Sequence, residues 1–393
     1  MRVVVAHPGR QHSHQLAMAL ADENMLLQYI TGVPTHPRAG WAILHPFVRH
    51  LAGRYDIPLS PSLVHHAFIS PIARRTVCRL ALRRHAVALA HRADGWFDTH
   101  VAQRLATLRP DVVIGYENAC LETFQRAKQM NVRTVLDAAA LHHTWQDRFH
   151  KPVASPRAHQ HILARKDAEI ELADNILTVS DYARTSYVEA GVPSSRVHTI
   201  PMGVALERFS VCGRRPRPHR PVRFVFVGSI SEHKGADVLR DCVRMLTARN
   251  VRFDLTVFGR HTSQVRLDDL PNVHCRGWVC HDRLAVELQS QDVLVLPSRH
   301  DSFGMVVAEA MACGLPAIVS DHVGAKEMVT PEVNGLVVPA GNAVALAAAL
   351  EWFVANRDRL RGMIPTARQT ARQYSWEAYR RRVVDQIRRY GRR

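Results

Sequence analysis

One turn of the sequence combines the groups that bind a phosphate. The apolar segment 222–228 predicts a strand that ends at Gly228, and a polar loop that begins at Ser229 leads to Lys234 at the start of a predicted helix. The backbone N–H groups of a helix start attract anions, and Lys234 would add a compact positive charge for a diphosphate. The loop lacks the glycine spacing of a Walker motif. An ordinary strand–helix turn with a surface lysine is the alternative interpretation.

A second segment carries two carboxylates eight residues apart, Asp301 and Glu309. The small residues around Glu309 predict a closely packed helix, so this carboxylate falls within a largely apolar stretch. A buried carboxylate requires hydrogen-bond donors, and the hydroxyl groups of a ligand are one source of them. The alternative is that Glu309 pairs with the surroundings of its own helix or with solvent.

Polar residues also follow the predicted strands of the amino-terminal half. Gly9 and Arg10 come directly after the first strand, where Gly9 allows a tight turn and Arg10 offers a forked donor for an anion. Glu117, His142 and His143 follow two later strands. These three side chains are candidates for contacts with sugar or acceptor hydroxyls, although the two histidines could equally cap a helix or lie on the surface.

The elements that must position these residues alternate along the whole chain. Short apolar runs followed by helical patterns predict parallel sheets covered by helices. The basic, proline-rich segment 212–221 interrupts this alternation and is typical of a linker. We therefore expect two Rossmann-like domains, residues 1–207 and 208–374. Ligands of such sheets lie at the carboxyl ends of the strands, so we expect the two sheets to face a shared cleft.

The charge of the chain favours anionic partners. The formal net charge is +17, from 52 lysine and arginine residues against 35 acidic ones. Segment 71–93 predicts a basic helix on which Arg75, Arg79 and Arg83 share one face, a pattern typical of helices that lie on an anionic membrane. A solvated face in an arginine-rich protein is the equal alternative. We expect no nucleic-acid partner, because the sequence contains no aromatic stacking platform or recognition motif.

Cysteine usage and hydropathy bear on the compartment. The seven cysteines form no C-x-x-C pair, which is typical of reduced thiols. The apolar run that follows Arg2 is too short for a secretory signal, and no stretch approaches the ~20 apolar residues that span a bilayer. We therefore expect a cytoplasmic protein, peripheral at the inner face of the membrane if the basic helix binds there.

Together, these segments resemble the retaining glycosyltransferases of family 4, which have the GT-B fold. The stretch HDSFGMVVAEAMACGLP, residues 300–316, is the most specific match, and it is similar to the family's pair of acidic residues separated by seven others. VGSISEHKG, the stretch 177–209, the GWV turn and DVLVLPS also match, in the family's order. The resemblance extends over nearly the whole chain.

The resemblance implies a role for each candidate residue. Lys234 would bind the donor diphosphate, Glu309 would hold the nucleotide ribose, and Asp301 would contact the transferred sugar. Gly9 and Arg10 would lie near the diphosphate or the acceptor. The terminal helix, residues 375–393, would pack back onto the first domain. The other residues of the predicted donor site are Gly228, Ser229, Ser302, Phe303, Gly304, Met305 and Val306.

Three positions depart from the family pattern. Asp301 stands where the family usually has glutamate, and Ser229 stands where many members have a second phosphate-binding arginine. Lys234 would then act alone or with Arg10. Tyr116 falls near the family's usual cleft histidine, so either of the two histidines that follow the next strand would have to take its place.

The implied reaction transfers a sugar from a nucleotide diphosphate sugar to a hydroxyl acceptor, a sugar or lipid-linked sugar, with retention of the anomeric configuration. Synthesis of cell-surface polysaccharide, lipopolysaccharide or glycolipid is the expected setting. No D-x-D motif is present, so we expect activity without a metal or other cofactor. A sugar-nucleotide 2-epimerase shares the architecture and is one alternative. A basic membrane- or nucleic-acid-binding protein is the other. The base, the sugar and the acceptor stay open.

Overall fold

A computed structural model describes residues 1–33, 35, 57–67, 83–149, 155–209 and 220–391. Most of the predicted linker 212–221 therefore lies outside the described residues, as do Arg75 and Arg79 of the predicted basic helix. The side chain of Arg83 is also not described. Two compact units divide the chain. Unit 1 comprises Met1–Thr178, Tyr187–Ile200 and Arg380–Arg393, and unit 2 comprises Val179–Ser186 and Pro201–Tyr379.

Unit 1 is built on a seven-stranded parallel sheet with the order β3-β2-β1-β4-β5-β6-β7. Its central strands are short apolar runs whose residues are almost all buried, as strands covered on both faces must be. The strands are β1 (Val3–His7), β2 (Leu26–Thr31), β3 (Val64–His66), β4 (Val112–Tyr116), β5 (Arg133–Ala138), β6 (Asn175–Thr178) and β7 (Val197–Thr199).

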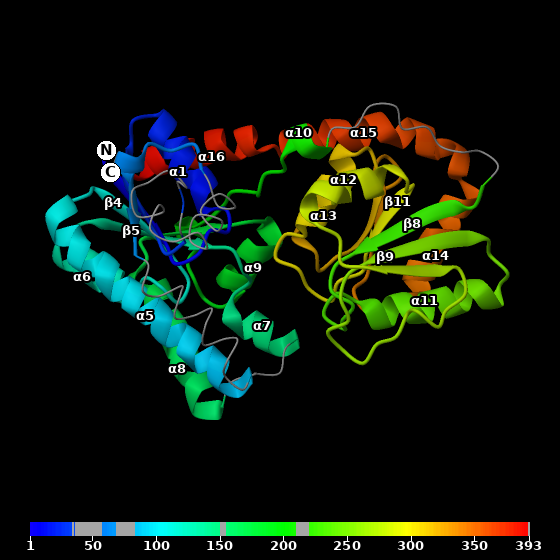
Figure 1. Ribbon diagram of the computed structural model, residues 1–393, viewed down its shortest axis with the longest axis horizontal. Coiled ribbons are helices and arrows are strands. Elements are labelled where there is room, and N and C mark those ends of the chain that lie inside the picture. Colours follow the sequence, from blue (N-terminus) through cyan, green and yellow to red (C-terminus); the bar gives the residue numbers. More distant parts are fainter. Residues whose placement is uncertain (34, 36–56, 68–82, 150–154, 210–219, 392–393) are drawn as a thin grey trace, which may run out of the picture. The chain divides into compact units, whose positions relative to one another are not determined.

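Helices cover both faces of this sheet. α1 packs against β1 and β2, whereas α5, α6 and α8 pack together on the opposite face (Figure 1). The helices lie on opposite faces because the connections between parallel strands are right-handed and run from the centre of the sheet toward both of its edges. The helices that lie wholly or partly in unit 1 are α1 (Ser13–Asp22), α5 (Arg83–Leu108), α6 (Leu121–Gln129), α7 (His143–Phe149), α8 (Pro156–Leu172), α9 (Asp181–Glu189) and α16 (Trp376–Tyr390).

Unit 2 is built on a six-stranded parallel sheet with the order β10-β9-β8-β11-β12-β13. The two parallel sheets of the predicted Rossmann-like fold are thus confirmed. The strands are β8 (Val222–Val227), β9 (Phe253–Phe258), β10 (Val273–Gly277), β11 (Val293–Leu296), β12 (Ala317–Ser320) and β13 (Gly335–Val338). The helices are α10 (Leu206–Phe209), α11 (Ala236–Ala248), α12 (His281–Gln289), α13 (Met305–Ala312), α14 (Ala343–Ala355) and α15 (Leu360–Gln373).

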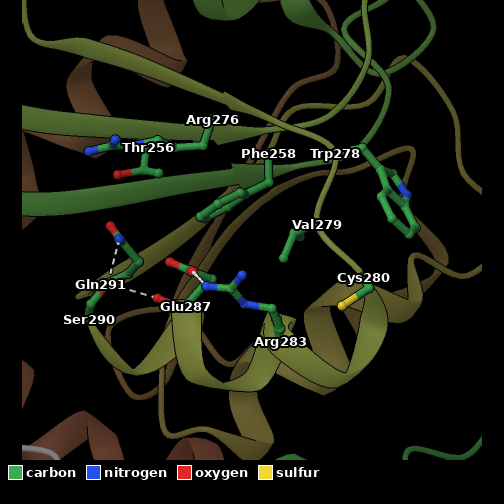
Figure 2. A pocket seen from close by; sticks show the side chains of 10 residues that line it. All are labelled: Thr256, Phe258, Arg276, Trp278, Val279, Cys280, Arg283, Glu287, Ser290 and Gln291. Atoms are coloured by element: carbon green, nitrogen blue, oxygen red, sulfur yellow. Dashed lines mark hydrogen bonds and ion pairs between the residues drawn. The ribbon is translucent and has the colours of Figure 1, made fainter.

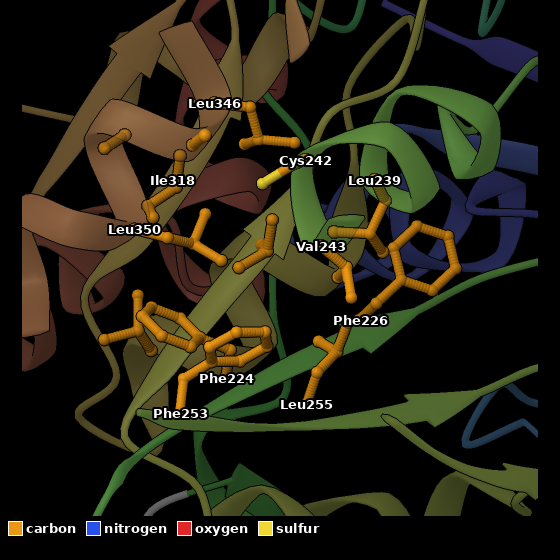
Figure 3. Close-up of a cluster of buried hydrophobic side chains, with 14 of the residues drawn as sticks. Phe224, Phe226, Leu239, Cys242, Val243, Phe253, Leu255, Ile318, Leu346 and Leu350 are labelled. Carbon is orange, nitrogen blue, oxygen red and sulfur yellow. The ribbon is translucent and has the colours of Figure 1, made fainter. Parts of the chain in front are cut away.

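The core of unit 2 lies between β8, β9 and the helices α11 and α14 (Figure 3). α11 presents Leu239, Cys242, Val243 and Leu246 to the sheet, a spacing that places all four on one face of the helix. α11 and α14 lie side by side on this face (Figure 1). This packing holds the start of α11, and with it Lys234, against the end of β8.

The sequence did not predict β2, β3, β10 or α15. β10 is an edge strand whose residues are half-buried or exposed, so it carries no apolar run for the pattern to detect. The predicted domain boundaries at residues 207 and 374 stay predictions. In the structure, Arg380–Arg393 is part of unit 1, and the side chain of Arg388 in α16 pairs with Glu23 at the end of α1.

Truncation of one core side chain should destabilise unit 2. Phe224 on β8 is fully buried and packs edge-on against Phe253, so Phe224→Ala would leave a large cavity. We expect the free energy of unfolding to fall by about 3–5 kcal/mol, measured by urea denaturation. Val344→Ala on α14 is the control, because Val344 is 58% exposed; its effect should stay within about 0.5 kcal/mol. Equal effects of the two changes would contradict this placement of the core.

Candidate functional site

The carboxyl ends of β8 and β11 form the centre of the candidate site in unit 2. The two strands are neighbours and run parallel, and the chain leaves them in opposite directions toward β9 and β12. Ligands of open parallel sheets bind at this reversal of strand order, because the two loops part there and leave a crevice. The loop after β8 carries Lys234, and the loop after β11 carries Asp301 through Gly304, with Met305 and Val306 following at the start of α13.

Two glycines shape the backbone at these helix starts. Gly235 precedes α11 with φ +73°, and a Cβ at this position would lie 2.0 Å from the carbonyl oxygen of Pro297. Gly304 precedes α13 with φ +88°, and a Cβ there would lie 2.8 Å from Cγ1 of Val323. Both positions require glycine, because the left-handed backbone and the close neighbours leave no room for a side chain.

Lys234 and Asp301 form an ion pair across the two loops. Lys234 Nζ lies 2.5 Å from Asp301 Oδ2, and their side chains are 22% and 16% exposed, so a ligand can still reach both. The preceding residues reinforce this link, since His233 Nδ1 lies 3.0 Å from His300 Nε2. The protein itself therefore balances the charge of Lys234.

The other predicted donor residues surround this pair. Ser302 is fixed through its backbone, because Ser180 Oγ donates to the Ser302 carbonyl oxygen at 2.6 Å. Ser229 Oγ lies 3.1 Å from Ser231 Oγ. Phe303 is buried, whereas Met305 and Val306 are half-buried on the first turn of α13. Gly228 closes β8 against Gly259, where a Cβ would meet the Gly228 carbonyl oxygen at 1.8 Å.

Glu309 lies within α13, where it is buried as the sequence predicted, and its hydrogen-bond partner is a histidine. His281 Nε2, at the first residue of α12, lies 2.8 Å from Glu309 Oε1. This hydrogen bond raises the pKa of His281 above its ordinary value. His281 was not predicted from the sequence, because a single histidine at the start of an amphipathic helix carries no distinctive signal.

A cavity of about 530 Å³ lies between α12 and the strands β9 and β10 (Figure 2). Cys280 lines it, and the next residue along the chain is His281. The guanidinium of Arg260 lies 5.6 Å from the ring of Trp278, an exposed side chain that also lines the cavity. The other lining residues are Thr256, Phe258, Arg276, Val279, Arg283, Glu287, Ser290 and Gln291. None of the residues proposed from the sequence is among them.

In unit 1, Gly9 and Arg10 lie at the equivalent reversal of strand order, between β1 and β4. The Gly9 N–H donates to His7 Nδ1 at 2.7 Å, and the Arg10 carbonyl accepts from Ser13. Burial lowers the pKa of His7 to about 4, so this imidazole is neutral at pH 7 and able to accept. The ring of His7 packs 4.3 Å from that of Tyr116, which ends β4. The turn that carries Arg10 is therefore held by two hydrogen bonds and by the contact of His7 with Tyr116.

The structure brings the three predicted acceptor-side residues of unit 1 together around Tyr187. The Tyr187 hydroxyl donates to Glu117 Oε1 at 2.6 Å, and the ring of His142 contacts that of Tyr187 at 5.1 Å. His142 and His143 lie 4.1 Å apart, measured between ring centroids. Burial lowers the pKa of His142 to about 4 and also lowers the pKa of His143. His142 also directly precedes α7. The histidines therefore lie at the start of a helix, as one interpretation of the sequence predicted, and also belong to the cluster around Tyr187.

Two expectations from the sequence concern the membrane. No helix among the described residues is long and apolar enough to cross a membrane. The expected association of segment 71–93 with a membrane stays a prediction, because most of that segment lies outside the described residues.

Two family models match the chain. Residues 60–208 match the family described as Glycosyltransferase Family 4, and residues 221–356 match that described as Glycosyl transferases group 1. The two ranges together cover more than half of the sequence. The boundary between the two ranges falls between the two sheets, since the first range contains β3–β7 and the second contains β8–β13.

Named relatives agree with this assignment. The chain is 31% identical to the amylovoran biosynthesis glycosyltransferase AmsK of Erwinia amylovora, over 49% of this chain and 51% of that protein. It is 28% identical to a D-inositol 3-phosphate glycosyltransferase of Xylanimonas cellulosilytica, over 76% of this chain and 73% of that protein. The match to AmsK therefore spans only about half of its length.

A solved structure has the same fold. The Anabaena protein HepE, crystallised with UDP and glucose, superimposes with a TM-score of 0.66 at 15% identity, covering 98% of this chain and 99% of that one. At this identity the likeness bears on the fold alone. The family models, the relatives and the shared fold lead to one conclusion: the chain belongs to the glycosyltransferases, with a family 4 domain followed by a group 1 domain, and has the GT-B fold.

Proposed function

We propose that this protein transfers a sugar from a nucleotide diphosphate sugar to a hydroxyl group of a sugar or lipid-linked sugar, with retention of configuration. The observation that carries the proposal is the Lys234–Asp301 ion pair at the parting of the loops after β8 and β11. The pair holds a cation ready at the point of the sheet where ligands bind.

The donor diphosphate would take the place of Asp301 beside Lys234. A diphosphate carries more negative charge than one carboxylate, so it competes well for the ammonium group. The starts of α11 and α13 would add the positive ends of two helix dipoles. Asp301, once displaced from Lys234, would be able to accept a hydrogen bond from a hydroxyl group of the transferred sugar.

The nucleoside would occupy the neighbouring part of unit 2. The ribose hydroxyls would donate to Glu309 and displace His281, whose exposed side chain can move into solvent. We infer that the base enters the cavity beside α12, where Phe258 and Trp278 offer aromatic surface. The HepE structure holds UDP and glucose, and a donor of that chemical class is the one proposed for this chain.

Transfer would require no general base from the protein. The acceptor oxygen bonds to the anomeric carbon as the bond from that carbon to the phosphate oxygen breaks, and the acceptor proton passes to an oxygen of the leaving diphosphate. Lys234 would stabilise the charge that develops on this leaving group. In unit 1, Glu117 and the neutral imidazoles of His142 and His143 would contact acceptor or sugar hydroxyls.

We propose a setting in the synthesis of cell-surface polysaccharide, lipopolysaccharide or glycolipid. The name of AmsK refers to the synthesis of amylovoran, and that of the second relative to a glycosylated inositol phosphate. One assay distinguishes this transferase from a sugar-nucleotide epimerase of the same architecture. When the protein is incubated with the donor alone, only an epimerase produces a new sugar nucleotide.

Two substitutions in unit 2 should affect different kinetic constants. Lys234→Ala should lower kcat by about a hundredfold, since the lost charge matters most when the diphosphate leaves. Glu309→Gln should act mainly on the donor KM, because the ribose contact is present in substrate and transition state alike. Steady-state kinetics over a range of donor concentrations will separate the two effects.

The control for both variants is Asp282→Asn, which changes an exposed carboxylate on the first turn of α12. It should leave both constants near those of the parent protein. Circular dichroism must first show that each variant is folded. Full activity of Lys234→Ala and Glu309→Gln at low donor concentration would contradict the assignment of the donor site.

Transfer should persist after chelation of divalent metals, because Lys234 and the two helix starts supply the counter-charge for the diphosphate. The measurement is the initial rate with and without excess EDTA. Complete loss of the rate, restored by Mg²⁺ or Mn²⁺, would show that a metal supplies this charge.

Nucleotide binding should release His281 from Glu309 and lower its pKa toward the ordinary value of 6.5. The measurement is a pH titration of the histidine resonances by NMR, with and without UDP. Glu309→Gln should lower the pKa of His281 without nucleotide. The pKa of His142, in unit 1, serves as the internal control and should not change in Glu309→Gln. A pKa of His281 that is insensitive to UDP would argue against ribose binding at Glu309.

A further inference from the structure

We propose that His142, His143 and Asp167 in unit 1 form a binding site for one divalent transition-metal ion of the zinc class. One potential ligand atom from each of the three residues lies within 4.8 Å of the other two. His142 directly precedes α7, His143 is the first residue of α7, and Asp167 lies on α8. Among the described residues, this is the one group of at least three histidine, cysteine or acidic side chains with such spacing.

The distances suit a small tetrahedral ion. His143 Nε2 lies 3.1 Å from Asp167 Oδ1. Two ligands that each lie about 2.0–2.1 Å from zinc at a tetrahedral angle are roughly 3.4 Å apart, so the ion could enter between these atoms with a small outward shift. The ring of His142 is tilted by 34° to that of His143, and it offers a nitrogen within 4.8 Å of the other two ligand atoms.

The chemistry of the three groups also matches zinc. Imidazole nitrogen and carboxylate oxygen are its usual ligands alongside thiolate. Both histidines are buried, with their rings side by side. Asp167 is exposed on α8, so an ion can reach the group from solvent.

The ion would inhibit transfer. It would bind the nitrogens of His142 and His143, which could then no longer form hydrogen bonds with acceptor or sugar hydroxyls. This consequence, unlike the binding itself, rests on the proposed function. Three protein ligands leave a fourth position for water, so the site would remain in exchange with solvent and chelators. Zinc should therefore lower the rate of transfer reversibly, and EDTA should restore it.

The test is zinc binding to the full-length protein without substrates, measured by competition with a chromogenic chelator. We expect one ion per chain at this site, with the affinity reduced at least about tenfold in His143→Gln and in Asp167→Asn. The chain contains 24 histidines, so the evidence is the difference between each variant and the parent protein. Binding of Co²⁺ should give visible absorption bands in the parent protein that both variants lose.

The matched control is His159→Gln. His159 Nε2 on α8 lies 3.2 Å from Asp147 Oδ2 on α7. The substitution therefore removes a histidine–aspartate contact between the same two helices and leaves the three proposed ligands in place. This variant should bind zinc as the parent protein does. Circular dichroism and a thermal unfolding curve like those of the parent protein should show that each variant is folded. Equal zinc affinity in the parent, His143→Gln and Asp167→Asn would overturn the proposal, as would an equal loss in His159→Gln. Zinc binding without inhibition would refute only the consequence for transfer.

Discussion

The parallel pairing of β8 with β11 is the constraint on which the donor side of this protein depends. These strands are distant in sequence, and each leads into a helix on a different side of the sheet. Their loops therefore part at the one edge where both strands end. Lys234 and Asp301 meet there because the backbone delivers them, and the glycines at both helix starts let the chain turn without a steric clash. Apolar packing beneath, between α11, α14 and the sheet, keeps the geometry fixed.

A second principle is that charged groups of the donor side are already paired within the protein. Lys234 has Asp301 as its partner, and Glu309 has His281. A carboxylate left unpaired in a buried or half-buried position would be costly, so each pair stabilises the side chains that form it. A ligand must then exchange one set of polar contacts for another. Such an exchange favours selectivity over affinity, because only a ligand with matching charge and hydroxyl groups compensates for the lost contacts.

Much of this arrangement could be predicted from the sequence. The buried strands of the sheet centres are continuous apolar runs, and Lys234, Asp301 and Glu309 fall at fixed offsets from them. The partners of these residues could not be predicted. His281 reaches Glu309 across 28 positions, and Tyr187 reaches Glu117 across 70. Such contacts depend on how helices pack, and local periodicity carries no information about that. Edge strands such as β10 could not be predicted for a related reason. Their residues are only partly buried, so their sequences need not be continuous apolar runs.

The division of the chain into units has a consequence for how the protein can be dissected. Val179–Ser186 belongs to unit 2, although the segments on either side of it belong to unit 1. Within unit 2, Ser180 supports the Ser302 carbonyl, and the backbone of Asp181 and Tyr182 donates to Glu327. A gene fragment that starts or ends between the two sheets would therefore separate these eight residues from their partners. The two units are interleaved rather than consecutive, and neither can be excised as one uninterrupted piece of polypeptide.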